Sequence, residues 1–282
     1  MKLNFTKMHG CGNDYIFIFC YDIEIKSPPR LSVMLSDRHT GVGGDGIVLI
    51  LRSEIADAKM RMFNADGSEG LMCGNAIRCV AKYLYDNGIV KKTIMRIETT
   101  SGVRSLYLTT VGGAVTSVKA DMGRAGLRPE QIPVLLDGDS VISRPVTVGG
   151  AVYEITCVSM GNPHAVIFRH DLEGLDICAL GPLFERDALF PDRVNVSFAD
   201  IVSRNRVNAR VWERGSGETR ACGTGACAVA VAAVLNGYCG KGEDIAVRLP
   251  GGELTVNYTD EAVYMTGDCV KVFEGAVEIP QG

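Results

Sequence analysis

The segment CGNAIRCVAKYLYDNG (residues 73–88) returns 149 residues later as CGTGACAVAVAAVLNG (residues 222–237). Both copies begin with Cys-Gly and end with Asn-Gly, and a glycine directly after an apolar run is a common helix stop. The first copy places its apolar residues at helical spacing, whereas the second is apolar on every side and must be wrapped by other structure. Each copy is therefore predicted to be a buried central helix.

The repeat extends beyond these two helices. A shift of 149 residues aligns positions 12–88 with 161–237 without a gap and gives fifteen identical residues, where composition alone gives roughly five. The identities gather in Gly-Asn turns and in the Cys-Gly motif itself. We therefore expect two similar domains related by a pseudo-two-fold axis, with equivalent loops meeting at their interface, where ligand pockets often lie.

Short apolar runs separated by turns rich in Gly, Asn and Asp predict strands around each helix. The expected strands cover residues 15–20, 46–51, 59–63, 94–99, 104–109, 151–158, 165–168, 194–198, 207–212, 245–249, 252–258 and 263–266. The expected fold class is α/β (α+β, mostly antiparallel), with two similar pseudo-symmetric domains, each a sheet or barrel wrapped around a central helix. The first domain is placed at residues 1–121 and the second at 122–268, with the linker around 121–143.

The composition is that of a globular protein with a sizeable core. The chain has 282 residues, of which 46% are hydrophobic and 22% charged. A net charge of −4 with scattered Lys and Arg predicts no nucleic-acid partner and no membrane partner. The longest uncharged stretch, residues 221–240, holds little Leu, Ile or Phe, which indicates a buried helix and not a membrane span. Lys7, His9 and Asp14 interrupt any export signal, so a cytoplasmic protein is expected.

Two of the ten cysteines stand apart from the rest. With no CxxC spacing and only four histidines, neither a disulfide scaffold nor a structural zinc site is expected. Cys73 and Cys222, however, each lie directly before a predicted helix, whose N-terminal charge lowers a thiol pKa and whose N–H groups can hold a carboxylate. Packing alone does not require cysteine in both copies. Two opposed thiols suit inversion at a carbon with an acidic hydrogen, because one removes the α-proton while the other delivers a proton to the opposite face.

Eight segments of the chain resemble the diaminopimelate epimerases. They are MHGCGND (8–14), GVGGD (41–45), FNADGSE (63–69), CGN (73–75), GNPH (161–164), NV (195–196), WERG (212–215) and ACGTG (221–225). The resemblance implies an isomerase that interconverts LL- and meso-2,6-diaminopimelate, a small-molecule substrate, in lysine and peptidoglycan biosynthesis. It implies no cofactor and no metal. It also implies a homodimer joined through the first domain, to which a C-terminal strand at 269–282 returns with Phe273 near the contact.

The resemblance gives a role to each candidate site residue. Cys73 and Cys222 are the proton acceptor and donor. The resemblance implies substrate contacts from Asn13, Asn64, Asn162, Asn195, Glu213 and Arg214. It implies that backbone groups bind the reacting carboxylate, at Gly74, Asn75, Gly223 and Thr224. It also implies that His164 and Glu213 tune the pKa values of the two cysteines. The residue types support two of these roles, because Arg214 suits a distal carboxylate and Glu213 an ammonium group. Many relatives carry Gln where this chain has Gly46, so Gly46→Gln is expected to add a substrate contact.

Other functions stay open at this point. A different cofactor-independent racemase of the same fold, acting on histidine, proline or hydroxyproline, would use the same thiols; Arg214 favours a dicarboxylic substrate, and histidine is the hardest of the three to exclude. The two cysteines could instead form a thiol redox switch, although no CxxC motif supports it. A non-catalytic binding module needs no paired cysteines. The glycine spacing of residues 41–46 fits a dinucleotide fingerprint, but it precedes a predicted strand and not a helix.

Overall fold

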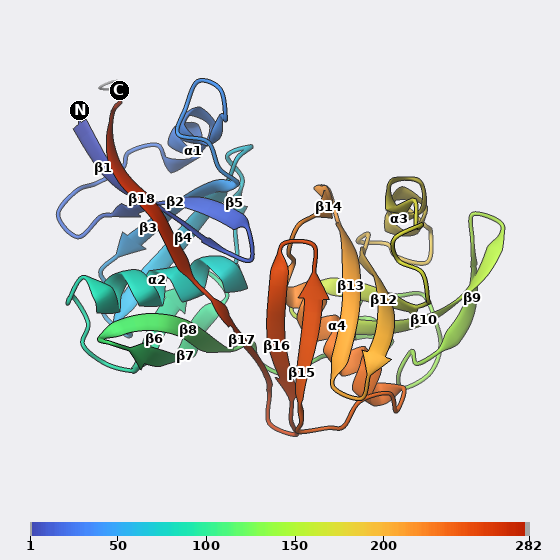
Figure 1. Ribbon diagram of the computed structural model, residues 1–282. Helices are drawn as coiled ribbons and strands as arrows, with labels where there is room; N and C mark the ends of the chain where they lie inside the picture. The colour runs from blue at the N-terminus through green and yellow to red at the C-terminus, as the bar shows by residue number, and fades with distance from the viewer. Residues whose placement is uncertain (1, 280–282) are drawn as a thin grey trace. The chain divides into compact units, whose positions relative to one another are not determined.

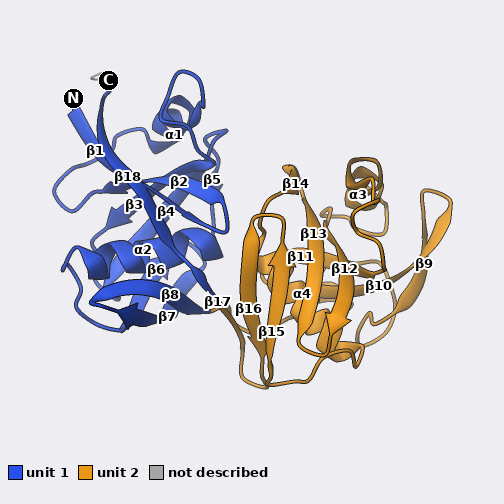
Figure 2. Ribbon diagram, in the orientation of Figure 1, with its two compact units in different colours: residues 1–120, 266–282 blue, residues 121–265 orange. Residues whose placement is uncertain are grey.

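The structure is a computed structural model that describes residues 2–279. Met1 and residues 280–282, the end of the expected C-terminal strand, lie outside the described residues. The chain divides into two compact units, namely residues 1–120 with 266–282 (unit 1) and residues 121–265 (unit 2), which Figure 2 shows in two colours. Within the described residues, no helix is long and apolar enough to cross a membrane.

Unit 1 surrounds one helix with mostly antiparallel strands (Figure 1). Its elements are β1 (Lys2–Gly10), β2 (Asn13–Phe19), α1 (Pro28–Ser36), β3 (Gly46–Leu51), β4 (Ala58–Asn64), β5 (Glu69–Gly70), α2 (Gly74–Asp86), β6 (Ile94–Thr99), β7 (Gly102–Val111), β8 (Ala114–Asp121) and β18 (Val270–Glu278). Helix α2 packs against β1, β2, β6 and β7. The apolar positions that predicted this helix, such as Ile77, Val80 and Leu84, are buried, so its apolar face lies against these strands.

Unit 2 repeats this plan around a second helix. Its elements are η1 (Pro129–Gln131), β9 (Arg144–Val148), β10 (Ala151–Ser159), β11 (Pro163–Phe168), α3 (Ile177–Glu185), β12 (Asn195–Ser203), β13 (Arg206–Glu213), β14 (Gly217–Thr219), α4 (Gly223–Leu235), β15 (Asp244–Leu249) and β16 (Gly252–Tyr258), and β17 (Val263–Asp268) leads back to unit 1. Helix α4 packs against β10, β11, β12, β13, β15 and β16. Every residue from Ala226 to Ala233 is buried, as an apolar helix requires.

The 149-residue repeat holds for whole structural elements. The shift carries β1 onto β10, α1 onto α3 and α2 onto α4 with matching bounds. The parallel pairing of Tyr15 with Gly46 in unit 1 returns as His164 with Asn195 in unit 2. The units differ at one edge, because β1 pairs with β18 whereas its counterpart β10 pairs with β9. The predicted fold class, two similar halves each with a central helix, is confirmed.

Several elements go beyond the predicted ones. Strands β1, β5, β8, β9 and β14, helices α1 and α3 and the short helix η1 are additions to the prediction. Helix α1 opens on Pro28-Pro29, and α3 carries Pro182 inside it. Proline lacks the N–H that a helix interior needs and usually signals a turn, which is why neither segment is recognisable as a helix from its sequence.

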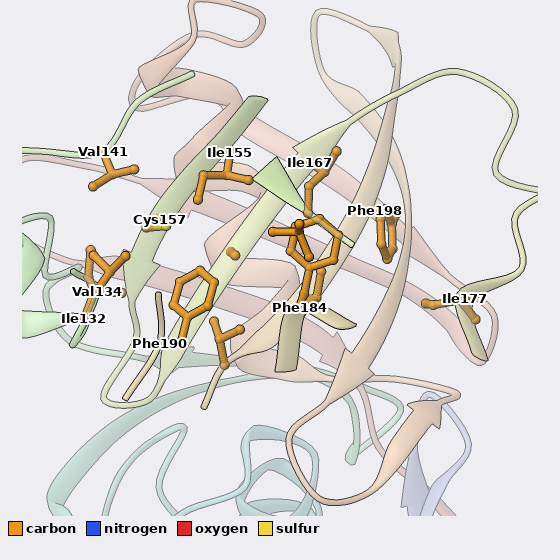
Figure 3. Packing of buried hydrophobic residues seen from close by; sticks show 14 of the residues in the cluster. Ile132, Val134, Val141, Ile155, Cys157, Ile167, Ile177, Phe184, Phe190 and Phe198 are labelled. Atoms are coloured by element: carbon orange, nitrogen blue, oxygen red, sulfur yellow. The ribbon is translucent and has the colours of Figure 1, made fainter. Parts of the chain in front are cut away.

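Helix α3 is fixed to the sheet of unit 2 by a buried aromatic ring. Phe184 is fully buried, and its ring lies edge-on to Tyr153 on β10 and Phe198 on β12, with centroid separations of 5.0 and 6.0 Å. Figure 3 shows Phe184 and Phe198 in one cluster with Ile155 and Ile167. Aromatic pairs in this geometry add to the stabilisation from buried area, so the end of α3 is held firmly in place.

Candidate active site

Cys73 and Cys222 occupy the same position at the starts of α2 and α4. Each is the N-cap residue of its helix, with extended backbone angles. The Sγ of Cys73 accepts the backbone N–H of Ala76 at 3.5 Å, and the Sγ of Cys222 accepts that of Gly225 at 3.3 Å. A sulfur atom therefore takes the place of the usual hydroxyl or carboxylate cap, at the end of the helix that carries positive partial charge.

The residues after each cysteine form the first turn of its helix. Gly74 and Asn75 open α2, and Gly223 and Thr224 open α4. Backbone N–H groups in a first helical turn point out of the helix end and suit an anionic group. Each unit thus places one sulfur atom beside one helix end that is suited to a carboxylate.

In unit 1, Asn13 links the cysteine to the first turn of α2. Its Oδ1 accepts from the Sγ of Cys73 at 3.4 Å and from the Nδ2 of Asn75 at 3.3 Å. Its own Nδ2 donates to the Oδ2 of Asp45 at 2.8 Å, and Asp45 is in turn paired with Arg38 at 3.0 Å. Because the carboxylate fixes which end of the amide points toward Asp45, the amide oxygen of Asn13 must face the thiol.

A buried guanidinium group also contacts the first turn of α2. Arg78 is fully buried and donates to Gly74 O at 3.0 Å, to Asn75 Oδ1 at 2.8 Å and to Asp268 O at 3.2 Å. Gly10 leaves the room for it, since a Cβ at that position would lie 2.8 Å from the guanidinium. Arg78 therefore ties the start of α2 to the strand that returns from unit 2.

In unit 2, a hydroxyl group replaces part of this arrangement. The Oγ1 of Thr224 lies 3.5 Å from the Sγ of Cys222 and accepts from the Nδ2 of Asn162 at 3.3 Å. The Oδ1 of Asn162 lies 3.0 Å from the Nε2 of His164. Asn162 is the counterpart of Asn13 in the repeat, and both contact the second residue of the following helix.

Burial dominates the electrostatics around Cys222. It raises the pKa of the Cys222 thiol well above its usual value, and the nearby Glu213 carboxylate raises it further. The backbone N–H of Gly225 at the helix N-terminus and the hydroxyl of Thr224 lower this pKa, in the expected direction, but desolvation outweighs both. Burial, with the charge of Arg214, also lowers the pKa of His164 to about 3, so its imidazole is neutral near pH 7.

The loop after β13 carries the two charged candidates. Glu213 accepts from the hydroxyl of Thr219. The backbone N–H of Arg214 donates to Asn195 Oδ1 at 2.9 Å, and the Nδ2 of Asn195 donates to Pro163 O at 2.9 Å. Asn195 is buried, so in this structure its amide fixes the backbone of Arg214. The exposed guanidinium of Arg214 donates to Asp192 O at 2.6 Å.

Asn64 ends β4 at the position that Glu213 holds in the repeat. Its Nδ2 donates to Ser68 Oγ at 3.0 Å, and its backbone N–H donates to Ser68 O at 2.8 Å. All the predicted site residues of unit 1 thus lie around the start of α2 or at the adjacent strand ends, and those of unit 2 lie likewise around α4. Among residues 2–279, no three His, Cys, Asp or Glu side chains gather as a metal site would need.

The comparisons with known proteins decide the family. The model of the diaminopimelate epimerase family matches residues 5–127 and 156–272. The chain belongs to the diaminopimelate epimerase family. A relative of that name from Desulfovibrio desulfuricans is 54% identical and covers 98% of each chain. Diaminopimelate epimerases from Acetivibrio thermocellus (50% identity, 98% of this chain and 99% of the relative) and Methanococcus maripaludis (49%, 98% and 100%) are similar.

Solved structures of other members of the fold class are more distant in sequence. A hydroxyproline epimerase from Agrobacterium vitis matches with a TM-score of 0.68 and 17% identity over 98% of this chain and 91% of that one. A phenazine biosynthesis protein of the PhzF family from Bacillus anthracis matches with a TM-score of 0.69 and 16% identity over 99% of this chain and 100% of that one. These likenesses show the fold. Membership of the diaminopimelate epimerase family makes the chain an isomerase and not a binding module.

This diaminopimelate epimerase family member has a steric reason for glycine at position 46. A Cβ on Gly46 would lie 2.1 Å from Phe63 O and 2.9 Å from the Tyr15 ring, and the backbone has a φ of +156°. Gly46 also pairs with Asn64 across β3 and β4. A side chain at position 46 would therefore require the backbone of β3 or β4 to shift, and the expectation that Gly46→Gln adds a substrate contact stays a prediction.

Sequence reasoning missed three residues that support the site. Asp45 and Ser68 orient Asn13 and Asn64, and both lie inside the segments that carry the family resemblance, so their position was a usable signal. Arg78 could have been found from a second signal in the sequence. It is a lone arginine on the apolar face of a predicted helix, and a buried guanidinium group needs hydrogen-bond acceptors.

Proposed function

We propose that this chain converts LL-2,6-diaminopimelate to the meso isomer without a cofactor, by moving the α-proton between two cysteines, Cys73 and Cys222. The matched caps carry the proposal, since both sulfur atoms accept the third N–H of equivalent helices. The proposal requires the two half-sites to meet on one α-carbon, as expected for a pseudo-symmetric isomerase. The product serves lysine and peptidoglycan biosynthesis.

In the proposed reaction one sulfur acts as the base and the other as the acid. The thiolate takes the α-proton, so the C–H bond breaks, an S–H bond forms and the electron pair moves toward the carboxylate. The second thiol then delivers its proton to the opposite face, and its S–H electrons stay on sulfur. N–H groups of the first turns of α2 and α4 stabilise the enolate-like dianion. The raised pKa of Cys222 supports it as the partner that holds a proton before substrate binds.

The charged loop of unit 2 supports the choice of substrate. Arg214 offers an exposed guanidinium whose planar donors match a carboxylate, and Glu213 offers a carboxylate for an ammonium group. Diaminopimelate has a second carboxylate for Arg214 to bind, whereas histidine lacks one. We therefore favour diaminopimelate over the histidine-racemase alternative, with His164 acting as a neutral residue beside Asn162.

We also propose a homodimer joined through unit 1. Val272 and Phe273 on β18 are 54% and 45% exposed, which supports an apolar contact at this strand. Sedimentation of the wild type beside a Phe273→Asp variant tests it. We expect a dimer for the wild type and a shift toward monomer for the variant; a fully active wild-type monomer at assay concentration would contradict the dimer.

The experiment for the reaction uses the pure protein in D₂O. LL-diaminopimelate should gain α-deuterium and convert to the meso isomer, while histidine in a parallel sample should not exchange. Cys73→Ala and Cys222→Ala should each abolish conversion with an unchanged far-UV CD spectrum. Cys178→Ala, which alters an exposed thiol, is the matched control and should keep activity. Near-normal turnover in either of the first two variants would refute the two-thiol mechanism.

A further inference from the structure

Unit 2 contains a buried carboxylate that the proposed mechanism does not use. Glu185 is the last residue of α3, directly after the buried Phe184, and only 4% of it is exposed. A carboxylate so deeply buried needs hydrogen-bond donors to both oxygen atoms. Its donors come from the end of β13, from the loop after that strand and from Arg193.

Both oxygen atoms of Glu185 are engaged. Its Oε2 accepts from the indole Nε1 of Trp212 at 2.7 Å. Its Oε1 accepts from the backbone N–H of Gly215 at 3.1 Å and lies 3.5 Å from a guanidinium nitrogen of Arg193. Hydrogen bonds to an ionised carboxylate are the stronger kind, so these contacts hold the loop firmly.

Trp212 and Gly215, which donate hydrogen bonds to Glu185, lie on either side of the charged pair Glu213-Arg214. Trp212 precedes the pair and Gly215 follows it. The indole ring of Trp212 also packs on Gly181 of α3, where a Cβ would lie 2.3 Å from the ring. The loop that presents the two charged candidates is thus clamped at both ends by one side chain of α3.

Unit 1 uses its equivalent helix for the same purpose. Ser32 on α1, the counterpart of Gly181, places its Oγ 3.0 Å from Phe63 O and 2.7 Å from Asn64 O. In unit 2 the same place carries a charged loop, and a buried carboxylate holds it.

We propose that Glu185 is a positioning residue that sets the substrate-binding geometry of Glu213 and Arg214 by holding Trp212 and Gly215. This inference rests on the proposed function. Glu185 itself touches no reacting atom. Its effect should therefore appear mainly as weaker binding of diaminopimelate, because the loop that it holds carries Arg214, the proposed partner of the distal carboxylate.

Glu185→Gln tests this with little change of shape. A Gln side chain has one acceptor oxygen, so its NH₂ group must face either the Trp212 or the Gly215 donor and one hydrogen bond is lost. We expect KM for LL-diaminopimelate to rise about ten-fold or more, which is about 1.4 kcal/mol, with kcat changed less than about three-fold. The matched control is Glu253→Gln on β16, whose exposed carboxylate pairs with Arg206 at 2.7 Å and should leave KM unchanged.

A spectroscopic signal reports the clamp without substrate. Trp212 is the only tryptophan of the chain, so its fluorescence reports this contact alone. Acrylamide should quench Trp212 faster in Glu185→Gln than in the wild type or in Glu253→Gln. Trp212→Phe removes the same donor while keeping an aromatic ring on Gly181. It should raise KM several-fold even if Glu185→Gln fails to fold.

The outcomes separate this inference from the proposed function. An active wild type with unchanged KM in both Glu185→Gln and Trp212→Phe would overturn the positioning role alone. Loosened Trp212 fluorescence with unchanged KM would overturn it as well, since the clamp would then be structural only. A wild type that does not convert diaminopimelate would overturn the proposed function, and this inference with it.

Discussion

Replacing Arg78 by Met should destabilise unit 1 far more than replacing an exposed arginine. The guanidinium of Arg78 is fully buried, and its acceptors include Gly74 O, Asn75 Oδ1 and Asp268 O. Met is similar in length and fills most of the space, so a cavity contributes little to the change. The main effect is the loss of a buried charged partner.

The expected magnitude follows from what remains after the substitution. The carbonyl oxygens of Gly74 and Asp268 and the amide oxygen of Asn75 each lose a charged donor. A hydrogen bond to a charged group contributes about 1.5–3 kcal/mol, so the loss of two or more of them costs at least about 3 kcal/mol. Arg52→Met is the matched control in the same unit, because Arg52 is 67% exposed and its partner Asp22 is 85% exposed. An exposed pair contributes about 0–1 kcal/mol. The two substitutions should therefore differ by at least about 2 kcal/mol.

Urea unfolding followed by far-UV CD measures the difference. Trp212 fluorescence is unsuitable for this comparison because the single tryptophan lies in unit 2. Arg78→Met should also reduce kcat/KM by about 10–100-fold, since Asn75 and the first turn of α2 lose a charge-assisted hydrogen bond of about 1.5–3 kcal/mol. Equal unfolding free energies for Arg78→Met and Arg52→Met would refute the reasoning that Arg78 holds this turn.

Three further outcomes are expected. Arg214→Lys should lower kcat/KM for diaminopimelate by roughly thirty-fold to several thousand-fold, from a loss of about 2–5 kcal/mol, because Lys lacks the planar fork; unchanged kinetics would contradict the assigned substrate class. The pKa of His164 falls from its usual value to about 3 in the folded state, so the unfolded chain binds the extra proton and stability is lost as pH falls below about 6.5. Between pH 6.5 and 5 the wild type should lose about 1.7 kcal/mol more than His164→Gln, and equal losses in urea titrations would show that the imidazole is not buried in this way. Gly46→Ala should cost about 3 kcal/mol of unfolding free energy, because its Cβ meets Phe63 O; a melting temperature equal to the wild type would remove the steric account.

The two helices and their cysteines were predictable because their signals are local. Helical spacing, the Asn-Gly stops and a gapless repeat all lie within short stretches of sequence. Helices α1 and α3 were not predictable in this way, since their stability comes from packing against the sheet. Phe184 illustrates this, because its burial between Tyr153 and Phe198 holds a helix that contains Pro182. Tertiary contact overrides local preference here.

The residues of the candidate site likewise include some that local sequence predicts and others that depend on tertiary contacts. The motif residues were found because their types and spacing carry chemistry. The groups that orient them were not, because Asp45 lies 32 residues from Asn13 and Glu185 lies 27 residues from Trp212. The raised pKa of Cys222 also depends on burial, which outweighs the effect of the helix end. Desolvation is a property of the folded surroundings, so no local pattern predicts its size.

The duplicated halves have kept their cysteines and changed the surroundings. Cys222 lies in a buried place beside the Glu213 carboxylate, whereas Cys73 lies beside the neutral amide of Asn13, with the buried cation of Arg78 bonded to Asn75. Two thiols in identical surroundings would have the same proton affinity, and neither would be favoured as acid or base. When the surroundings of two thiols differ, one thiol has the higher proton affinity and holds the shared proton in the resting state. The divergence of the two half-sites therefore fits the proposed two-thiol reaction, and the raised pKa of Cys222 favours the resting proton on that side.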